Sequence, residues 1–289
     1  LALSFFLHIC ISELVLNKNN VMEQTQQQPQ IQPQAEQKPQ FPTEEVTLPS
    51  KGLLYPEGSP LRSGKINMKY MTAREEDILT NQNYIKNGTV IDKLLQSLIV
   101  DNIKVEDLLI GDKNAILVAA RILGYGQDYS FNYRNPNTGE EEEVSVDLTE
   151  ANDKELDESL MINGKNEFEF TLPTSKISLT FKLLTQADEK KIDNELKGLK
   201  KINKNSDPQL TTRLKHLIKS VNGDYSTKTV REFVDNNFLA RDSRPFREYA
   251  ASIMPDINLN FNVTFDDGTV IEDVTIPIGI GFFWPDASV

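Results

Sequence analysis

The sequence predicts an α+β fold in which β-hairpins cluster against a helical layer. Four stretches alternate apolar and polar residues with the period of a half-buried strand, and each is interrupted by residues that favour tight turns. Helix-start signals and stretches of helical apolar spacing lie between the strands. The chain has 289 residues, of which 38% are hydrophobic, so it can bury a core.

Period-2 patterns place the predicted strands in four groups. The first group contains residues 46–48 and 53–55 together with Ile66, Met68 and Tyr70. The other three are hairpins, in which residues 129–133 pair with 144–148, 168–172 with 177–183, and 259–265 with 274–278. Their connecting segments contain the Pro, Asn, Asp and Gly residues that such turns use.

Helices are predicted from capping signals and apolar spacing. Thr72 and Glu75 form a capping box, so a helix should begin there, and residues 185–188 repeat this signal before a helix toward Leu196. Residues 90–99 are amphipathic, and residues 113–123 form a nearly all-apolar helix that stops at Gly124. Three further helices are expected: one capped by Asp207-Pro208 that runs to Val221, one opened by a capping box at 229–232, and one that starts at 242–245 and ends at Pro255.

The order of these elements predicts two related halves. Each contains a strand, a capped helix after an apolar-Thr pair, a core helix that ends near a glycine, and a hairpin. The second half inserts an extra helix, residues 229–254, before its hairpin. We expect residues 46–160 and 161–289 to be the N-terminal and C-terminal α+β halves of one compact unit, related by a diverged duplication.

Residues 1–45 are expected to lie outside this unit. The apolar run at 1–11 lacks the charged start and the cleavage site of a signal peptide, and it is too short to span a bilayer. Because the first methionine is Met22, we interpret residues 1–21 as upstream translated sequence, with a buried or membrane-contacting segment as the alternative. Residues 23–42 are rich in Gln and Pro and are predicted to be a flexible tail, with a proline-rich recognition peptide as the alternative.

Composition argues against several kinds of chemistry. The single cysteine, Cys10, excludes an intrachain disulfide and a zinc site built on several thiolates. Two histidines, His8 and His216, are too few for a three-histidine metal site. We therefore expect no catalytic residue, no metal and no cofactor. The net charge of −12 argues against nucleic acid as a partner, and we expect no membrane partner either.

Acidic clusters are interpreted as structural. Glu75, Glu76 and Asp77 begin a predicted helix, and consecutive helical positions point in different directions, so capping is favoured over an acid/base pair. The acidic run at 140–143 lies at a predicted hairpin tip, where acids usually stay solvated, and a calcium site is the weaker alternative.

The candidate functional residues form predicted protein-binding surfaces. A basic stretch runs through residues 190–219, and because it has no interleaved aromatic residues for base stacking, a charge-complementary protein is favoured over nucleic acid. The charged segment 241–244 and the aromatic C-terminal end contain residue types typical of interfaces. For the aromatic end, packing into the core is favoured, and use at an interface is the alternative. The predicted interface residues are Lys197, Lys200, Lys201, Arg213, His216, Arg241, Asp242, Arg244, Phe283 and Trp284.

Ordered blocks of sequence resemble one known family. They lie at 48–56 (Leu-Pro-Ser-Lys-Gly-Leu-Leu-Tyr-Pro), 71–79, 86–95, 111–117, 211–216, 233–236, 240–244 and 283–286. Through them the chain from about residue 46 onward resembles the baseplate hub proteins of T-even-type contractile-tailed bacteriophages. The resemblance implies a non-enzymatic hub subunit or hub assembly factor that contacts other hub and tail proteins. It also implies a location in the host bacterial cytoplasm during assembly, and the tail baseplate of the virion as a second location.

Two alternative functions stay open. Some hub proteins carry lysozyme activity, so a cell-wall-degrading hub enzyme is one alternative, although the sequence nominates no pair of carboxylates set across a cleft. A genome-contacting tail protein is the other, and it would bind DNA in a salt-dependent way.

The sequence departs from this family at two hairpin tips. Family members often carry a Cys-Pro-x-Cys-Gly knuckle at each tip, and the two together would suit a four-thiolate zinc site. Here the tips, residues 135–139 and 265–269, contain no cysteine. We predict that the two hairpins still lie close together, held by apolar side chains and hydrogen bonds.

Overall fold

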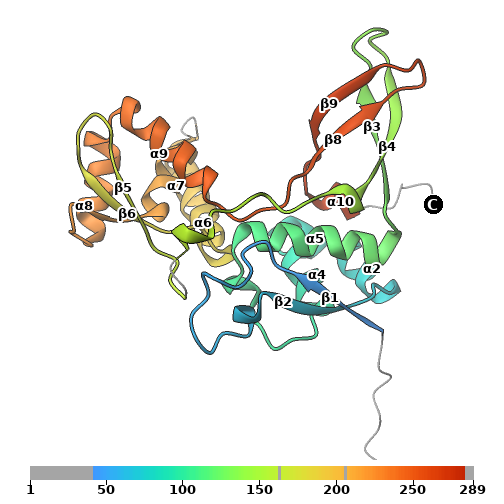
Figure 1. Cartoon of the computed structure of the whole chain (residues 1–289), viewed down its shortest axis with the longest axis horizontal. Helices are drawn as coiled ribbons and strands as arrows, with labels where there is room; N and C mark the ends of the chain where they lie inside the picture. The colour runs from blue at the N-terminus through green and yellow to red at the C-terminus, as the bar shows by residue number, and fades with distance from the viewer. Residues whose placement is uncertain (1–41, 162–163, 205–206, 284–289) are drawn as a thin grey trace, which may run out of the picture. The chain divides into compact units, whose positions relative to one another are not determined.

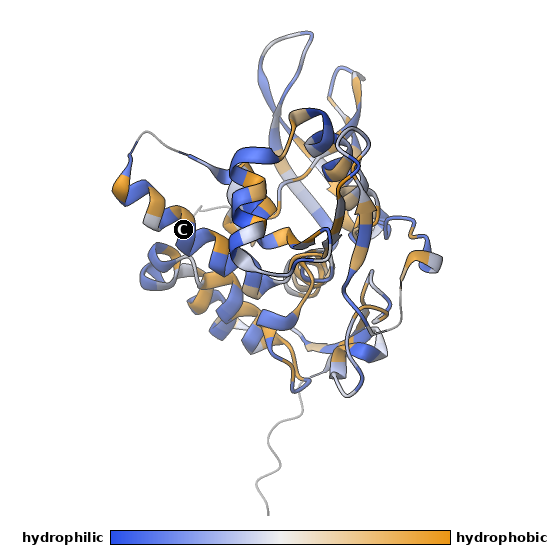
Figure 2. Cartoon of the chain, turned by 90° about the vertical axis from the view of Figure 1, so that its left-hand side faces the viewer, coloured by the Kyte–Doolittle hydropathy of each residue, from blue (hydrophilic) through white to orange (hydrophobic). Residues whose placement is uncertain are grey.

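A computed structural model describes residues 42–161, 164–204 and 207–283. All described residues fall in the unit Phe41–Val289. The predictions for residues 1–41 lie outside the described residues. The α+β class is confirmed, because small antiparallel sheets of two or three strands alternate with helices throughout the described part (Figure 1). Hydrophobic and hydrophilic residues alternate along these elements (Figure 2).

The first sheet pairs β1 (Thr43–Thr47) with β2 (Lys65–Lys69), with Val46 opposite Ile66. The strand predicted at 53–55 is wrong, since these residues lie in turns followed by the 3-10 helix η1 (Pro60–Ser63). The cause is the backbone at Gly52, which has a φ of 74°. A Cβ at Gly52 would lie 2.4 Å from the carbonyl oxygen of Arg62, so only glycine allows this close approach.

Helices follow the first sheet and bury a shared apolar core. They are α2 (Ala73–Thr80), α3 (Gln82–Asn87), α4 (Val90–Leu98), η2 (Val105–Asp107) and α5 (Ile110–Tyr125). The amphipathic helix predicted at 90–99 is confirmed as α4, and its Leu94 and Leu95 are fully buried. The central helix α5 ends at Tyr125 rather than before Gly124, because Gly126, at φ 88°, is the residue that terminates it.

Two hairpins that are far apart in sequence lie side by side (Figure 1). They are β3 (Asp128–Arg134) with β4 (Glu141–Asp147), and β8 (Asn260–Thr264) with β9 (Val270–Thr275). Between the tips, Asn137 Nδ2 donates to Thr269 Oγ1 at 2.8 Å and Asn135 Nδ2 to Asp267 Oδ2 at 3.3 Å. The predicted approach of the tips through hydrogen bonds is therefore confirmed, and amide, carboxylate and hydroxyl groups stand where a thiolate zinc site would need sulfur.

A three-stranded sheet combines β5 (Phe168–Thr171), β6 (Ser178–Phe181) and β7 (Ile218–Val221). The helix predicted to run to Val221 is wrong over its last turn, because α7 (Gln209–Leu217) ends and β7 begins at Ile218. Pairing with β6 decides this change, since Ser220 lies opposite Thr180 and its buried hydroxyl donates to the Thr180 hydroxyl at 2.8 Å.

Helices α6 (Gln186–Ile202), α8 (Thr227–Glu232) and α9 (Ala240–Ser252) complete this part of the chain, with a π-helical turn at Phe233–Asn237. The capping box predicted at 229–232 is wrong. Ser226 is the cap, and its hydroxyl accepts from the Thr229 N–H, so α8 begins at Thr227. The last long helix begins at Ala240, before the predicted start at 242, because the N–H groups of Asp242 and Ser243 already bond to the Leu239 carbonyl.

Short elements join these parts. They are the 3-10 turns Leu148–Glu150 and Glu158–Leu160 and the final helix α10 (Ile280–Phe283). Strand β1 starts at Thr43, slightly before the expected start of the N-terminal half at residue 46. The relation of halves 46–160 and 161–289 by duplication stays a prediction.

Candidate functional site

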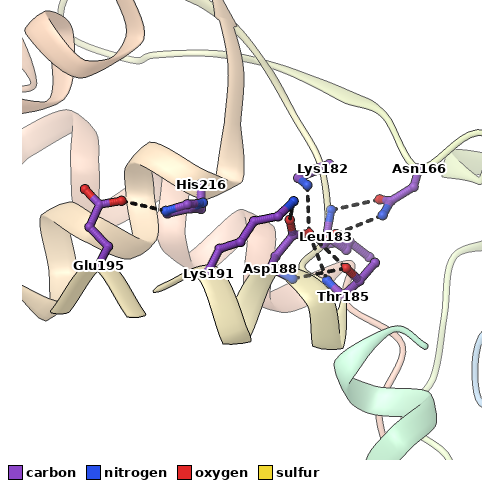
Figure 3. Close-up of polar contacts among 8 residues, drawn as sticks. All are labelled: Asn166, Lys182, Leu183, Thr185, Asp188, Lys191, Glu195 and His216. Carbon is purple, nitrogen blue, oxygen red and sulfur yellow. Dashed lines mark hydrogen bonds and ion pairs between the residues drawn. The ribbon is translucent and has the colours of Figure 1, made fainter. Parts of the chain in front are cut away.

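The start of α6 is built by side chains from the segment between β6 and α6 and from the helix itself (Figure 3). Thr185 caps the helix, and its N–H donates to Asp188 Oδ2 at 3.2 Å. Lys182 Nζ donates to the same oxygen at 2.7 Å, and Lys191 lies 3.8 Å from the other oxygen. Burial alone would raise the pKa of Asp188, but the bonds from Lys182 and Thr185 outweigh it and the pKa is lowered.

The basic stretch predicted at 190–219 is largely neutralised within the chain. Arg213 forms an ion pair with Glu189, with Nη1 and Oε2 2.9 Å apart, and this pair joins α7 to α6. His216 Nε2 lies 2.9 Å from Glu195 Oε2 (Figure 3), and Arg231 of α8 binds both oxygens of Glu195 at 2.8 and 3.0 Å. Through these contacts, Arg213 and His216 hold α7 against α6.

The Glu195 carboxylate shows how strong this internal pairing is. The hydrogen bond from Arg231 contributes most to lowering its pKa, burial opposes it, and the bond with His216 adds to it, which gives a pKa of about 2. Glu195 therefore stays ionised at neutral pH and links α6, α7 and α8 through one side chain. This arrangement is structural, because both basic side chains that face the carboxylate, Arg231 and His216, bind it directly.

A different part of the basic stretch remains available at the surface. Lys197, Lys200 and Lys201 lie in the last turns of α6, are exposed, and form no ion pair within the described residues. Ile202 ends the helix beside them with 86% of its surface exposed. The structure thus separates the predicted basic surface into an internally paired part and an exposed end.

The segment 241–244 is likewise divided. Asp242 is completely buried, and its two oxygens accept the N–H groups of Thr174 and Ser175 at 2.6 and 3.0 Å, so it fixes the β5–β6 turn instead of facing a partner. Arg241 is exposed and has no ion pair among the described residues. Arg244 is 78% exposed and binds Glu248 on the same helix at 2.8 Å.

The aromatic C-terminal end is only partly described. Phe283 is buried and packs edge-on against Phe282, with ring centroids 5.4 Å apart. Its side chain therefore belongs to the core, as the favoured interpretation expected, and not to a surface. Trp284 lies outside the described residues.

The acids at the start of α2 behave as the capping interpretation predicted. The Thr72 N–H donates to Glu75 Oε2 at 3.0 Å, and Lys69 Nζ and Ser97 Oγ donate to Oε1 at 2.8 and 2.6 Å. Burial alone would raise the pKa of Glu75, yet these bonds lower it to about 2. A carboxylate held ionised in this way is a poor general base, which supports a structural role.

Sequence reasoning missed a buried carboxylate in the first turn of α5. Asp112 is fully buried and accepts hydrogen bonds from the Ser50 N–H and hydroxyl, at 2.8 and 2.6 Å, and from the Tyr55 hydroxyl at 2.6 Å. Burial raises its pKa, and these bonds oppose the rise. Since Tyr55 in turn accepts the Leu109 N–H, the network anchors the 48–56 segment to α5. Ser50 and Tyr55 lie 62 and 57 residues before Asp112 in the sequence, so no local sequence pattern reveals the network.

A second missed cluster joins α4, η2 and α6. Lys190 Nζ lies 3.0 Å from Asp92 Oδ2 and 2.9 Å from Glu106 Oε1, and Gln186 Nε2 donates to the buried Asp92 at 2.9 Å. Lys113 Nζ donates to Gln186 at 2.7 Å, and burial lowers the pKa of Lys113. Within the described ranges, no group of three His, Cys, Asp or Glu side chains is arranged to hold a metal ion.

These features define the class of protein: an α+β chain of small sheets and helices, in which the charged clusters described above bind one another within the chain. A sequence model of the family described as T4 bacteriophage base plate protein matches residues 42–283. The chain belongs to this family and is a phage baseplate structural protein. No curated protein and no solved structure matches it. Among the described residues, no helix is both long and apolar enough to cross a membrane.

Proposed function

We propose that the chain is a hub subunit or hub assembly factor of the baseplate of a contractile-tailed phage, and that it acts without catalysis by binding neighbouring hub and tail proteins. The observation that carries the proposal is the extent of the family match. It spans residues 42–283, which is the whole described range, so every described segment belongs to the baseplate family match. The protein would act in the host cytoplasm during assembly and in the tail baseplate of the particle.

Exposed cations, of which Arg244 is paired with Glu248 on its own helix, supply contact residues for such partners. Lys197, Lys200 and Lys201 lie beside the exposed Ile202 at the end of α6. Arg241 and Arg244 follow Leu239, which is 50% exposed at the start of α9. An apolar side chain next to cations is typical of an interface that meets an acidic surface, because the apolar group adds affinity and the charges add specificity.

The test is native mass spectrometry of the full chain mixed with the purified hub and tail proteins of the same phage. We expect a defined complex with at least one of them, and a weaker one when Lys197, Lys200 and Lys201 are all replaced by Glu. The matched control is Lys86→Glu with Lys228→Glu, which changes exposed lysines of α3 and α8. A chain that binds none of the baseplate proteins would contradict the proposal.

Two further measurements refine it. Mass spectrometry of purified particles separates a retained subunit, which would be found in the virion, from an assembly factor, which would not. A peptidoglycan clearing assay with the isolated chain tests the absence of catalysis. Clearing that a point substitution abolishes without unfolding the chain would overturn the non-enzymatic part of the proposal.

A further inference from the structure

An apolar groove of about 260 Å³ lies between α7 and α9. One wall is a single stripe of α7, where Leu210, Leu214 and Leu217 follow the i, i+4, i+7 spacing of one helix face. The opposite wall is formed by Ala250 and Ala251 of α9. Small side chains on one wall and leucines on the other leave a trough between two helices.

The groove leaves apolar surface uncovered. Leu210 is 47% exposed, although a leucine on the inward stripe of a helix is usually buried. Ala251 is also exposed, whereas Leu214 and Ala250, deeper in the groove, are buried. Helices α7 and α9 both turn apolar side chains toward this gap. They therefore leave room for a third helix to pack against them.

The charges at the rim determine what kind of residue would complete the groove. Arg213 is already paired with Glu189. Arg247 is exposed, donates to the Ser243 carbonyl at 3.3 Å, and has no ion pair among the described residues. The groove therefore presents an apolar floor with one cation that lacks an acidic partner, and its complement is an apolar segment that carries an aspartate or glutamate.

We propose that this groove binds an amphipathic helix of a neighbouring baseplate protein, with apolar residues at i, i+3 or i+4 and i+7 and an acidic residue that meets Arg247. The proposal rests on the proposed function, because it takes the partner from the baseplate. A helix is favoured over a strand because both walls are helix faces, which offer side chains and no free backbone donors for strand addition. A single rim arginine on a chain of net charge −12 is poorly suited to an anionic membrane.

The first experiment maps the occupant of the groove. A photo-cross-linking amino acid replaces Leu210 in the full chain, and the complex with the baseplate proteins is illuminated and digested. We expect one cross-linked partner segment with helical apolar spacing and an acidic residue. The same amino acid at Val270, which is exposed on β9, is the control position and should not give this product. Cross-links to residues 1–41 of the same chain, or to a second copy, would overturn the proposal.

The second experiment tests the groove by substitution. We expect Arg247→Glu to weaken the complex about tenfold, because it places like charges together, and a compensating acid-to-arginine change in the cross-linked segment to restore it. Ala251→Trp should fill the groove and weaken binding as much or more, while its exposed position lets the chain fold, as circular dichroism and the melting temperature will show. The control is Arg74→Glu, an exposed arginine of α2.

The two proposals fail in different ways. If the unmodified chain binds no baseplate protein, the proposed function fails. If the unmodified chain binds and the Arg247→Glu and Ala251→Trp variants bind equally well, the groove proposal is wrong and the proposed function stands.

Discussion

The starts of α2 and α6 contain the same arrangement of three side chains in different surroundings. In each, a lysine precedes a threonine by three residues and an acid follows it by three residues. The two sets are Lys69, Thr72 and Glu75, and Lys182, Thr185 and Asp188. In both, the lysine binds the acid, at 2.8 and 2.7 Å, and the threonine N–H donates to it, at 3.0 and 3.2 Å.

The difference lies in what else the acid binds. Glu75 is fully buried and also accepts from Ser97 of α4 at 2.6 Å, so its carboxylate joins two helices. Asp188 has as its additional neighbour Lys191 of its own helix, at 3.8 Å. The comparison teaches that local sequence determines the cap, whereas a residue distant in sequence determines how much the acid contributes to stability.

The matched arrangement also bears on the predicted duplication. Both sets follow a strand and begin a helix, one in residues 46–160 and the other in residues 161–289. The same spacing and the same hydrogen bonds therefore recur once in each predicted half. The duplication nevertheless stays a prediction, which a second match elsewhere in the halves would strengthen.

The largest expected effect is from removal of the acid of α2. Glu75→Ala removes a fully buried carboxylate that accepts from the part-buried Lys69 and Ser97, and we expect a loss of about 3–5 kcal/mol in the free energy of unfolding. Asp188→Ala should lose less, about 1.5–3 kcal/mol, because its network is local. Urea unfolding followed by circular dichroism measures both, with Asp77→Ala on the exposed face of α2 as the control. Equal losses for the two acids would contradict the comparison.

The capping boxes illustrate what sequence predicts well. Thr72 with Glu75 and Thr185 with Asp188 interact across three residues, and the hairpins at 129–148 and 168–183 close through local turns, so short patterns suffice for both. Strand β7 was missed because Ile218–Val221 continues the apolar spacing of α7 and becomes a strand only through pairing with β6.

The candidate site was less predictable for the same reason. The basic side chains of Arg213 and His216 are evident in the sequence, but their partners Glu189 and Glu195 lie on another helix, 24 and 21 residues away. Asp242 likewise looked like a surface charge, and only the folded chain brings the β5–β6 turn to it. Long-range pairing, which short patterns do not encode, determined which predicted interface residues remain available.

The next effect in size is the response to acid. The pKa of Glu75 is lowered from its ordinary 4.5 to about 2, so between these values the unfolded chain binds a proton that the folded chain does not. The stabilisation that the ionised Glu75 contributes should be fully present above about pH 4.5 and should be lost as the pH decreases toward 2. Glu75→Gln should make the fall in the free energy of unfolding with decreasing pH shallower. The change in this variant should be smaller than the loss expected for Glu75→Ala. Urea unfolding at a series of pH values will measure it.

The acid response cannot be removed completely by this substitution. Glu195 has a pKa of about 2 for a different reason, chiefly the bond from Arg231, so it contributes to the same pH range. Combining Glu75→Gln with Glu195→Gln should therefore flatten the profile more than either change alone. A profile that Glu75→Gln leaves unchanged would show that its carboxylate is not held ionised by Lys69 and Ser97.

The smallest expected effect is from the cap hydroxyls. Thr72→Ala and Thr185→Ala each remove a hydroxyl that donates to the acid, at 2.6 and 3.1 Å, and each should lose about 1 kcal/mol. Thr→Ser at either position keeps the hydroxyl and should recover most of the loss. Nearly equal losses in urea unfolding are expected because the caps are local. A much larger loss at Thr72 would instead show that its cap and the Ser97 contact strengthen each other as one network.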